Sequence, residues 1–152
     1  MSARFRVVVV GKPRAKWAQA AVDDYTKRLR RLGGVEEAVV RHERFTGDVD
    51  AVRAAEAQRI GTAARGRLVC LDERGERLDT DAFTTLVDEG RQRGTLSFAL
   101  GGAYGHDPST REAAWRTVRL SDLVLNHELA RVVLYEQLYR AMTRIQGLPY
   151  HH

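Results

Sequence analysis

The sequence has little cysteine, proline or lysine, and it has no long apolar run. Its single cysteine, Cys70, excludes an internal disulfide and any zinc site built from several cysteines. The longest apolar run, Val7–Val10, is far shorter than the roughly 20 apolar residues of a membrane-spanning helix. The stretch 5–10 is also too short for a secretory signal, and charged residues follow it. We therefore expect a cytoplasmic protein without a membrane anchor.

Motifs of nucleotide and nucleophile chemistry are also absent. The chain has no G-x-x-x-x-G-K-[ST] loop, no G-x-G-x-x-G fingerprint and no G-x-S-x-G turn. A nucleotide-binding hydrolase is therefore only a weak alternative. The terminal pair His151 and His152 has no acidic or cysteine residue at ligand spacing, so we expect no metal site. Cys70 lies in an apolar segment, which favours a buried, inert thiol.

Basic residues are in excess and unevenly placed. The chain has 25 Lys and Arg against 20 Asp and Glu, and all but three of the basic residues are arginine. Residues 1–31 carry nine basic and two acidic side chains, whereas residues 77–152 balance at nine and nine. Arginine pairs well with phosphates, so the asymmetry indicates a nucleic-acid-facing surface, although an ordinary solvated face gives the same pattern. The candidate RNA-docking residues are Arg4, Arg6, Lys12, Arg14 and Lys16.

Strand-like and helical patterns alternate along these 152 residues. Apolar runs predict strands at 5–10, within 35–45, at 67–71, at 95–100 and within 118–125. Helical spacing predicts helices over 14–32, 48–64, 80–93, 109–116 and 126–145, with Thr80 or Asp81 and Ser109 or Thr110 as caps, and a turn over 72–76. This alternation predicts an α/β fold: one domain over 1–152, with a mostly parallel sheet and flanking helices.

A glycine-rich loop follows the fourth predicted strand. The strand at 95–100 runs directly into Gly101-Gly-Ala-Tyr-Gly105. Glycines let a ligand approach the backbone closely, and ligands of open α/β sheets bind at the carboxyl ends of the strands. The loop is therefore a candidate small-ligand site, with a ligand-free tight turn as the alternative.

The last predicted helix is apolar on more than one side. Between Leu129 and Ile145, eleven of seventeen residues are apolar or tyrosine. Such a helix must be covered twice, and we expect the second cover to be another subunit. An aspartate at Leu134 or Leu138 should then disrupt the dimer. Glu136 and Arg140, at i and i+4, form either a surface ion pair or a buried, site-forming one.

A series of short motifs runs along the whole chain. They are Leu68-Val-Cys-Leu-Asp72, Leu100-Gly-Gly with Gly105, Leu120-Ser-x-Leu-x-Leu125, Asn126-His127, Arg131, Glu136-Gln-Leu-Tyr-Arg-Ala141 and the ending Pro149-Tyr-His151. In this order they resemble the RlmH family, whose members are SPOUT-class methyltransferases acting on N3 of a pseudouridine in helix 69 of bacterial 23S ribosomal RNA. The glycine loop alone would not be specific for this family. The block at 136–141 together with the ending at 149–151 is specific for it.

The resemblance implies a fold, a methyl donor and an assembly. The fold is a trefoil knot, in which the C-terminal segment threads through a loop, and the donor is S-adenosylmethionine. The assembly is a homodimer built on the last helices, in which one subunit's tail approaches the other's donor site, and the substrate is the assembled ribosome. The donor contacts that the resemblance implies are Leu71, Gly101, Leu120, Ser121, Asp122, Leu123, Val124 and Leu125.

The chemistry of the implied reaction points to residues near the chain end. A sulfonium donor is already activated, so the protein must chiefly align the reactants. The N3 proton of the acceptor must leave, so a base, or a cation that stabilises the imide anion, should stand nearby. Arg140 is suited to hold a phosphate or that anion. We expect Arg140, Tyr150 and His151 to face the RNA, with His127 as a further catalytic candidate and Glu136 and His152 as alternative bases.

The chain differs from the family pattern at four positions. Many members have proline and an acidic residue where Ala103 and Tyr104 stand, proline in place of Asn126, and arginine or lysine in place of His152. Histidine is only partly charged near neutral pH, so the last difference concerns RNA contact and proton handling. The alternative function is a non-catalytic RNA- or ribosome-binding protein on the same fold, which need not bind S-adenosylmethionine.

Overall fold

The β-branched run near the chain start becomes β1 (Phe5–Val10), which pairs on both sides within a parallel sheet. The computed structural model describes residues 3–152. Within them, five parallel strands lie in the order β2-β1-β4-β3-β5. The other strands are β2 (Val35–Val40), β3 (Arg67–Arg77), β4 (Leu96–Leu100) and β5 (Arg116–Arg119). The predicted α/β class and parallel sheet are confirmed.

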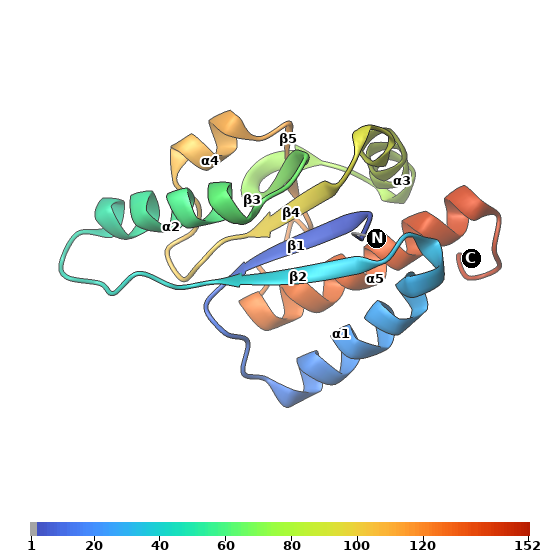
Figure 1. Cartoon of the computed structure of the whole chain (residues 1–152), viewed down its shortest axis with the longest axis horizontal. Coiled ribbons are helices and arrows are strands. Elements are labelled where there is room, and N and C mark those ends of the chain that lie inside the picture. Colours follow the sequence, from blue (N-terminus) through green and yellow to red (C-terminus); the bar gives the residue numbers. More distant parts are fainter. Residues whose placement is uncertain (1–2) are drawn as a thin grey trace.

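Helices cover both faces of the sheet (Figure 1). One face carries α1 (Lys16–Leu29), α3 (Thr80–Gly90) and α5 (His127–Gln146), whose apolar residues share the main core with β1, β3 and β4. The other face carries α2 (Val49–Ala63) and the short α4 (Pro108–Ala113). Short 3₁₀ turns, Arg30–Leu32 and Arg91–Arg93, follow α1 and α3. Among these helices, none in residues 3–152 is long and apolar enough to cross a bilayer.

Side-chain caps set where the helices begin. Asp48, Asp79, Asp107 and Asn126 each accept hydrogen bonds from backbone N–H groups in the first turn of α2, α3, α4 and α5. The predicted caps of α3 and α4 were therefore wrong by one to three residues. At α4, Pro108 takes the first helical position, where its missing N–H costs nothing, and this moves the cap back to Asp107.

The junction of β3 and β5 differs from the prediction. The expected turn at 72–76 is part of β3, but Leu71 and Glu76 both align with Val118, so residues 72–75 are out of register. Gly75 permits this close packing, because a Cβ there would lie 2.5 Å from the backbone nitrogen of Val118. The fifth strand ends at Arg119 rather than lying within 118–125, because the following residues leave the sheet and line a pocket.

The apolar surface of α5 is covered largely by its own chain. Leu134 and Leu138 are completely buried against the sheet, with α1 and α3 packed on either side of the helix. The prediction that an aspartate at either position would disrupt a subunit contact was therefore wrong, because these side chains do not lie on the surface. The aspartate would instead bury a charge in the core of the single chain. The apolar residues of α5 that remain partly exposed include Leu129, Val132 and Val133.

Candidate donor pocket and tail cluster

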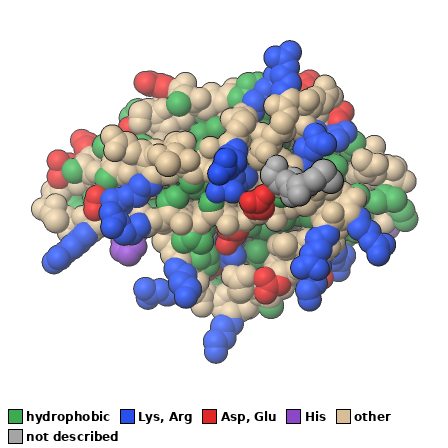
Figure 2. Space-filling view, in the orientation of Figure 1, with side chains coloured by type: hydrophobic (Ala, Val, Ile, Leu, Met, Phe, Trp, Pro, Cys, Tyr) green, Lys and Arg blue, Asp and Glu red, His purple; other side chains and the backbone are tan. Residues whose placement is uncertain are grey.

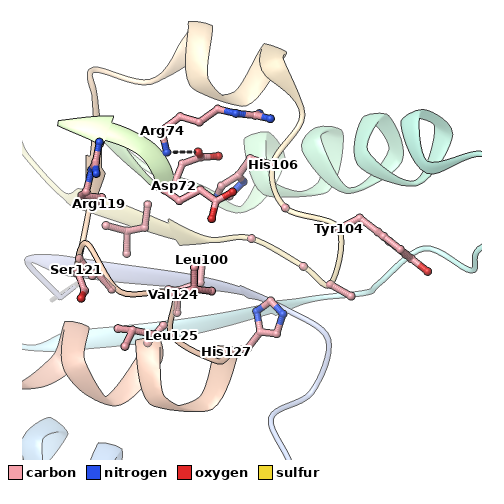
Figure 3. Close-up of a pocket in the computed structure, with 18 of the residues that line it drawn as sticks. Asp72, Arg74, Leu100, Tyr104, His106, Arg119, Ser121, Val124, Leu125 and His127 are labelled. Atoms are coloured by element: carbon pink, nitrogen blue, oxygen red, sulfur yellow. Dashed lines mark hydrogen bonds between the residues drawn. The ribbon is translucent and has the colours of Figure 1, made fainter. Parts of the chain in front are cut away.

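A pocket of about 530 Å³ opens at the carboxyl ends of β3, β4 and β5 (Figure 3). Three chain segments line it: residues 71–74 after the first half of β3, residues 100–106 after β4, and residues 119–121 and 123–125 after β5. His127, at the start of α5, closes the rim. In Figure 3, Asp72 and His106 lie on one side of the pocket and Ser121, Val124 and Leu125 on the other.

Seven of the eight predicted donor contacts line this pocket. They are Leu71, Gly101, Leu120, Ser121, Leu123, Val124 and Leu125. Asp122 does not line it: Asp122 pairs with Arg77 and Arg119 on the exposed edge of β3 and β5. The hydrogen bonds from Arg77 hold the pKa of the Asp122 carboxyl below its usual range. In this structure Asp122 therefore stabilises the loop.

The glycine loop is a tight turn with no room for side chains at its base. The backbone N–H of Gly105 donates to Gly102 O at 3.0 Å. A Cβ on Gly101 would lie 3.3 Å from the Gly105 carbonyl carbon and the His106 ring, and a Cβ on Gly102 would lie 2.6 Å from Glu56 Oε1. The loop therefore offers backbone to a ligand at the pocket wall.

Several polar residues of the pocket were not among the predicted site residues, and the most buried of them are Asp72 and His106. Asp72 accepts the backbone N–H of Arg74 at 2.8 Å and an Arg111 N–H at 3.2 Å. His106 is buried, and its Nε2 donates to Ala99 O at 3.1 Å, while the buried Nδ1 has no hydrogen-bond partner within residues 3–152. Burial lowers the pKa of His106, so this ring is neutral. Both residues directly follow sequence features already singled out, the strand at 67–71 and the glycine loop.

The predicted RNA-facing residues form one cluster at the far end of α5. Arg140 Nη1 donates to His151 Nδ1 at 2.9 Å, and the Arg140 guanidinium lies over the Tyr150 ring. Glu136 Oε2 accepts hydrogen bonds from Arg140 at 2.9 Å and from Tyr150 at 2.7 Å. Burial, together with the hydrogen bonds to Tyr25 and Glu136, raises the pKa of Tyr150, which therefore stays protonated. We call Glu136, Arg140, Tyr150 and His151 the tail cluster.

The tail cluster does not meet the pocket of its own chain. Arg140 stands thirteen residues after His127 on α5, which is roughly 20 Å at 1.5 Å per residue. Figure 1 shows the C-terminus near the amino end of β1, whereas the pocket lies at the carboxyl ends of the strands. Among the predicted catalytic residues, only His127 therefore lines the pocket.

The predicted RNA-docking residues fall in two places. Arg4 and Arg6 lie at the amino end of β1, where Arg4 donates to Arg91 O and Arg6 pairs with Glu36. Lys12 and Arg14, between β1 and α1, and Lys16, the first residue of α1, are exposed at the pocket end of the sheet. Figure 2 shows Lys and Arg side chains distributed around the visible face, not gathered into one patch. The segment therefore does not form a single basic surface.

The start of α5 is tied to the start of α1. Glu128 Oε2 accepts the backbone N–H groups of Ala15 at 2.9 Å and Arg14 at 3.0 Å. These bonds, that of Ala15 first, hold the pKa of Glu128 below its usual range. Large apolar side chains are exposed on the neighbouring segments: Trp17, Leu123, Val124 and Leu129. We call these four residues the apolar patch.

Cys70 plays no part in either cluster. The thiol is completely buried within β3. Burial, with a smaller contribution from the charge of Asp72, raises its pKa to about 12. The thiol is therefore protonated and inert near neutral pH.

Comparisons with known proteins cover nearly the whole chain. Residues 3–151 match a family described as "Predicted SPOUT methyltransferase". The "Ribosomal RNA large subunit methyltransferase H" of Geotalea uraniireducens is 37% identical over 153 residues, covering 98% of this chain and 99% of that protein. The protein of the same name from Variovorax paradoxus is 43% identical over 149 residues, covering 95% of this chain and 96% of that one.

A solved structure shares the fold at low identity. A crystal structure of a "Probable Methyltransferase" from Bordetella pertussis superposes with a TM-score of 0.58 at 16% identity, covering 92% of this chain and 95% of the other. This likeness supports the α/β architecture. The match over residues 3–151 and the identity to full-length relatives show the family. The chain belongs to the RlmH family of SPOUT methyltransferases.

Proposed function

We propose that the protein transfers a methyl group from S-adenosylmethionine to 23S ribosomal RNA in the assembled ribosome. The acceptor in this proposal is N3 of a pseudouridine in helix 69, as the family resemblance implies. Relatives that match this chain from end to end are named large-subunit ribosomal RNA methyltransferases. The observation that carries the proposal is the pocket, because three segments far apart in the sequence converge there on seven of the predicted donor contacts.

The residues of the pocket fit the donor. A volume of about 530 Å³ lies within the roughly 300–1,000 Å³ of small-molecule sites. Gly101 leaves backbone exposed where a Cβ would meet the opposite side of the loop, and His106 Nδ1 is a buried acceptor that has no partner in the described part of the chain. Glu73 is an exposed carboxylate on the pocket wall, suited to a sulfonium, whereas Asp72 is already paired with Arg111. When bound there, S-adenosylmethionine would supply an already activated methyl group.

A complete active site in this proposal needs two copies of the chain. The apolar patch and the partly buried Val132 and Val133 offer a surface through which the α5 helices of two copies pack. If the helices run in opposite directions and cross near Val132, the partner's Arg140 comes within about one helical turn, along the axis, of His127. The tail cluster of one copy then lies at the pocket rim of the other. The trefoil knot implied by the resemblance remains part of this proposal.

The tail cluster suits an imide acceptor. N3 becomes nucleophilic when its proton leaves, and a guanidinium stabilises the resulting anion. Glu136 and Tyr150 hold Arg140 in place, and Arg140 donates to His151 Nδ1. A neutral His151 ring in this arrangement carries its proton on Nε2, where it acts as a donor. The N3 proton accordingly passes to solvent, while Arg140 and His151 stabilise the charge that remains.

Two measurements test the proposed function. Calorimetry should show S-adenosylmethionine binding at about one site per chain, with micromolar affinity or better, about −8 kcal/mol. Labelled methyl groups should then enter the 23S RNA of ribosomes that lack the modification. Donor binding without any transfer would contradict the proposed reaction. Ribosome binding without donor binding would favour the alternative, a non-catalytic ribosome-binding protein.

A further inference from the structure

A second cavity of about 940 Å³ lies beside the donor pocket, at the carboxyl ends of β1 and β2. The glycine loop separates the two cavities, and residues 100–104 line both. The connection from β2 to α2, residues 41–45, forms much of the second wall, and Figure 1 shows this connection extending beyond the sheet. Gly101 is the one predicted donor contact among the lining residues, and no residue of the tail cluster lines this cavity.

Two exposed aromatic rings stand together at this cavity. The centroids of Phe45 and Tyr104 are 5.6 Å apart with the rings tilted by 34°, and the side chains are 49% and 40% exposed. In Figure 3 the Tyr104 ring points away from the donor pocket. Arg53 Nε donates to the Tyr104 carbonyl at 2.8 Å, which fixes the loop to α2. Large exposed rings held in place are suited to stack on a planar ligand.

Unpaired positive charge surrounds the two rings. Within residues 3–152, none of the four exposed basic side chains on the cavity wall forms an ion pair with a carboxylate; they are Lys12, Arg14, Arg41 and Arg44. Two of the three acids on the wall are engaged: Glu43 pairs with Arg59, and Glu128 accepts two backbone N–H groups. The third, Glu56, is buried and accepts the backbone N–H of Glu43 through Oε2, so the exposed charge on the wall is mostly positive. The cavity therefore attracts an anionic ligand.

Buried polar atoms at the cavity have no protein partner. Arg131 is 2% exposed and lines the cavity; its Nε and Nη2 bind Glu37, but its Nη1 makes no hydrogen bond within the described chain. Glu56 is 4% exposed and also lines the cavity, with Oε1 likewise unpartnered. A donor and an acceptor left open in this way suit a ligand with polar edges, such as a nucleobase.

We propose that this second cavity binds a single-stranded RNA segment, with one base stacked on Phe45 and Tyr104 and its phosphates held by the four basic residues. The inference rests on the proposed function, because it assigns a place to RNA next to the donor pocket. Stacking platforms flanked by cations are the usual means of holding single strands, whose bases are free to stack.

The test compares variants of the full-length protein in binding to a labelled eight-nucleotide single-stranded RNA and to a duplex of the same length. Phe45→Ala should weaken single-strand binding by about tenfold, the low range for loss of one stacked base. Phe45→Trp should restore binding to within about threefold, because it keeps a stacking ring. Arg44→Gln should lower the slope of log affinity against log salt by about 0.7. Arg30→Gln, which removes an exposed charge beyond α1, should leave this slope unchanged.

Donor binding and self-association separate the possible results. Phe45 does not line the donor pocket, so Phe45→Ala should keep the wild-type affinity for S-adenosylmethionine and the wild-type sedimentation coefficient. Wild-type RNA affinity in Phe45→Ala would overturn the inference. Loss of RNA binding together with dissociation of the subunits would also overturn it, because the cavity would then belong to a subunit interface. If the wild type binds no donor but Phe45→Ala still loses RNA, the methyltransferase proposal fails and the RNA site stands.

Discussion

The Tyr150 hydroxyl donates a hydrogen bond to Oε2 of Glu136 at 2.7 Å, and this bond holds the end of the chain against α5. The Tyr150 ring also packs edge-on against Tyr139, with centroids 4.7 Å apart. These two contacts position the last residues against α5, although those residues contribute little to the core. Preorganisation of this kind is expected for groups that must meet a transition state in fixed geometry.

Removing the tail should affect catalysis far more than folding. A chain ending at Leu148 lacks Tyr150 and His151 but keeps every residue of the main core. It should still dimerise and bind S-adenosylmethionine within about tenfold, roughly 1.4 kcal/mol. Its single-turnover methyl transfer to ribosomes should fall at least ~100-fold. Transfer at the wild-type rate would show that the tail is dispensable and would leave His127 or solvent to assist the reaction.

Filling the glycine loop should abolish donor binding. The branched side chain in Gly101→Val would occupy the space between Gly101 and His106, where a Cβ already comes within 3.3 Å. Calorimetry should detect no S-adenosylmethionine binding, while circular dichroism should show a folded protein. Gly61→Ala is the matched control, because a Cβ there meets nothing within 4 Å. Wild-type affinity in a folded Gly101→Val protein would mean that the donor binds elsewhere.

The apolar patch should determine the dimer. Leu129 is 39% exposed, so Leu129→Asp should leave the chain folded. The variant should be a monomer at tens of micromolar, roughly the range where obligate dimers persist. Leu134→Asp should instead unfold the chain, because Leu134 is completely buried. Sedimentation and circular dichroism distinguish these results. A folded Leu129→Asp dimer would exclude this patch as the interface.

Glu128 should make stability depend on pH. Its pKa is lower in the folded chain than the value near 4.3 of an unfolded glutamate, so its contribution is fully present above about pH 5 and is lost as pH falls through the folded pKa. Glu128→Gln should lower the free energy of unfolding by about 1 kcal/mol at pH 7, and the difference should narrow below about pH 4. Urea titrations at pH 7, 4 and 3 measure this, with the exposed Glu112→Gln as control. If the difference in free energy of unfolding between the wild type and Glu128→Gln does not change with pH, the two backbone hydrogen bonds are not its cause.

Much of the fold could be read from local patterns. The runs that became β1 and β4 are apolar on both faces, as inner parallel strands must be, and Asp48 and Asn126 cap helices that the spacing predicted. The break in β3 could not be read, because a sequence of charged residues around Gly75 is equally typical of a turn. The break forms because Leu71 and Glu76 both align with Val118, which lies in β5, more than forty residues later in the chain.

The two clusters were predictable to different degrees. The donor pocket lies where strand ends and glycines indicate a site, and the i,i+4 spacing brought Glu136 next to Arg140. The aromatic pair was not predictable, because Phe45 and Tyr104 are distant in sequence and meet only through tertiary packing. Which side of α5 stays exposed was equally hidden, since Leu129 and Leu134 look alike in an apolar pattern.

The central claim is that one chain's pocket works with the other chain's tail cluster. The direct test mixes two inactive homodimers, Gly101→Val and Arg140→Ala, under conditions that allow subunit exchange. Half of the resulting dimers are mixed, and each mixed dimer has one intact pocket facing one intact tail, so methyl transfer should recover to about a quarter of the wild-type rate. If each chain instead used its own tail, every site would carry a defect, and the mixture would stay as inactive as its two components.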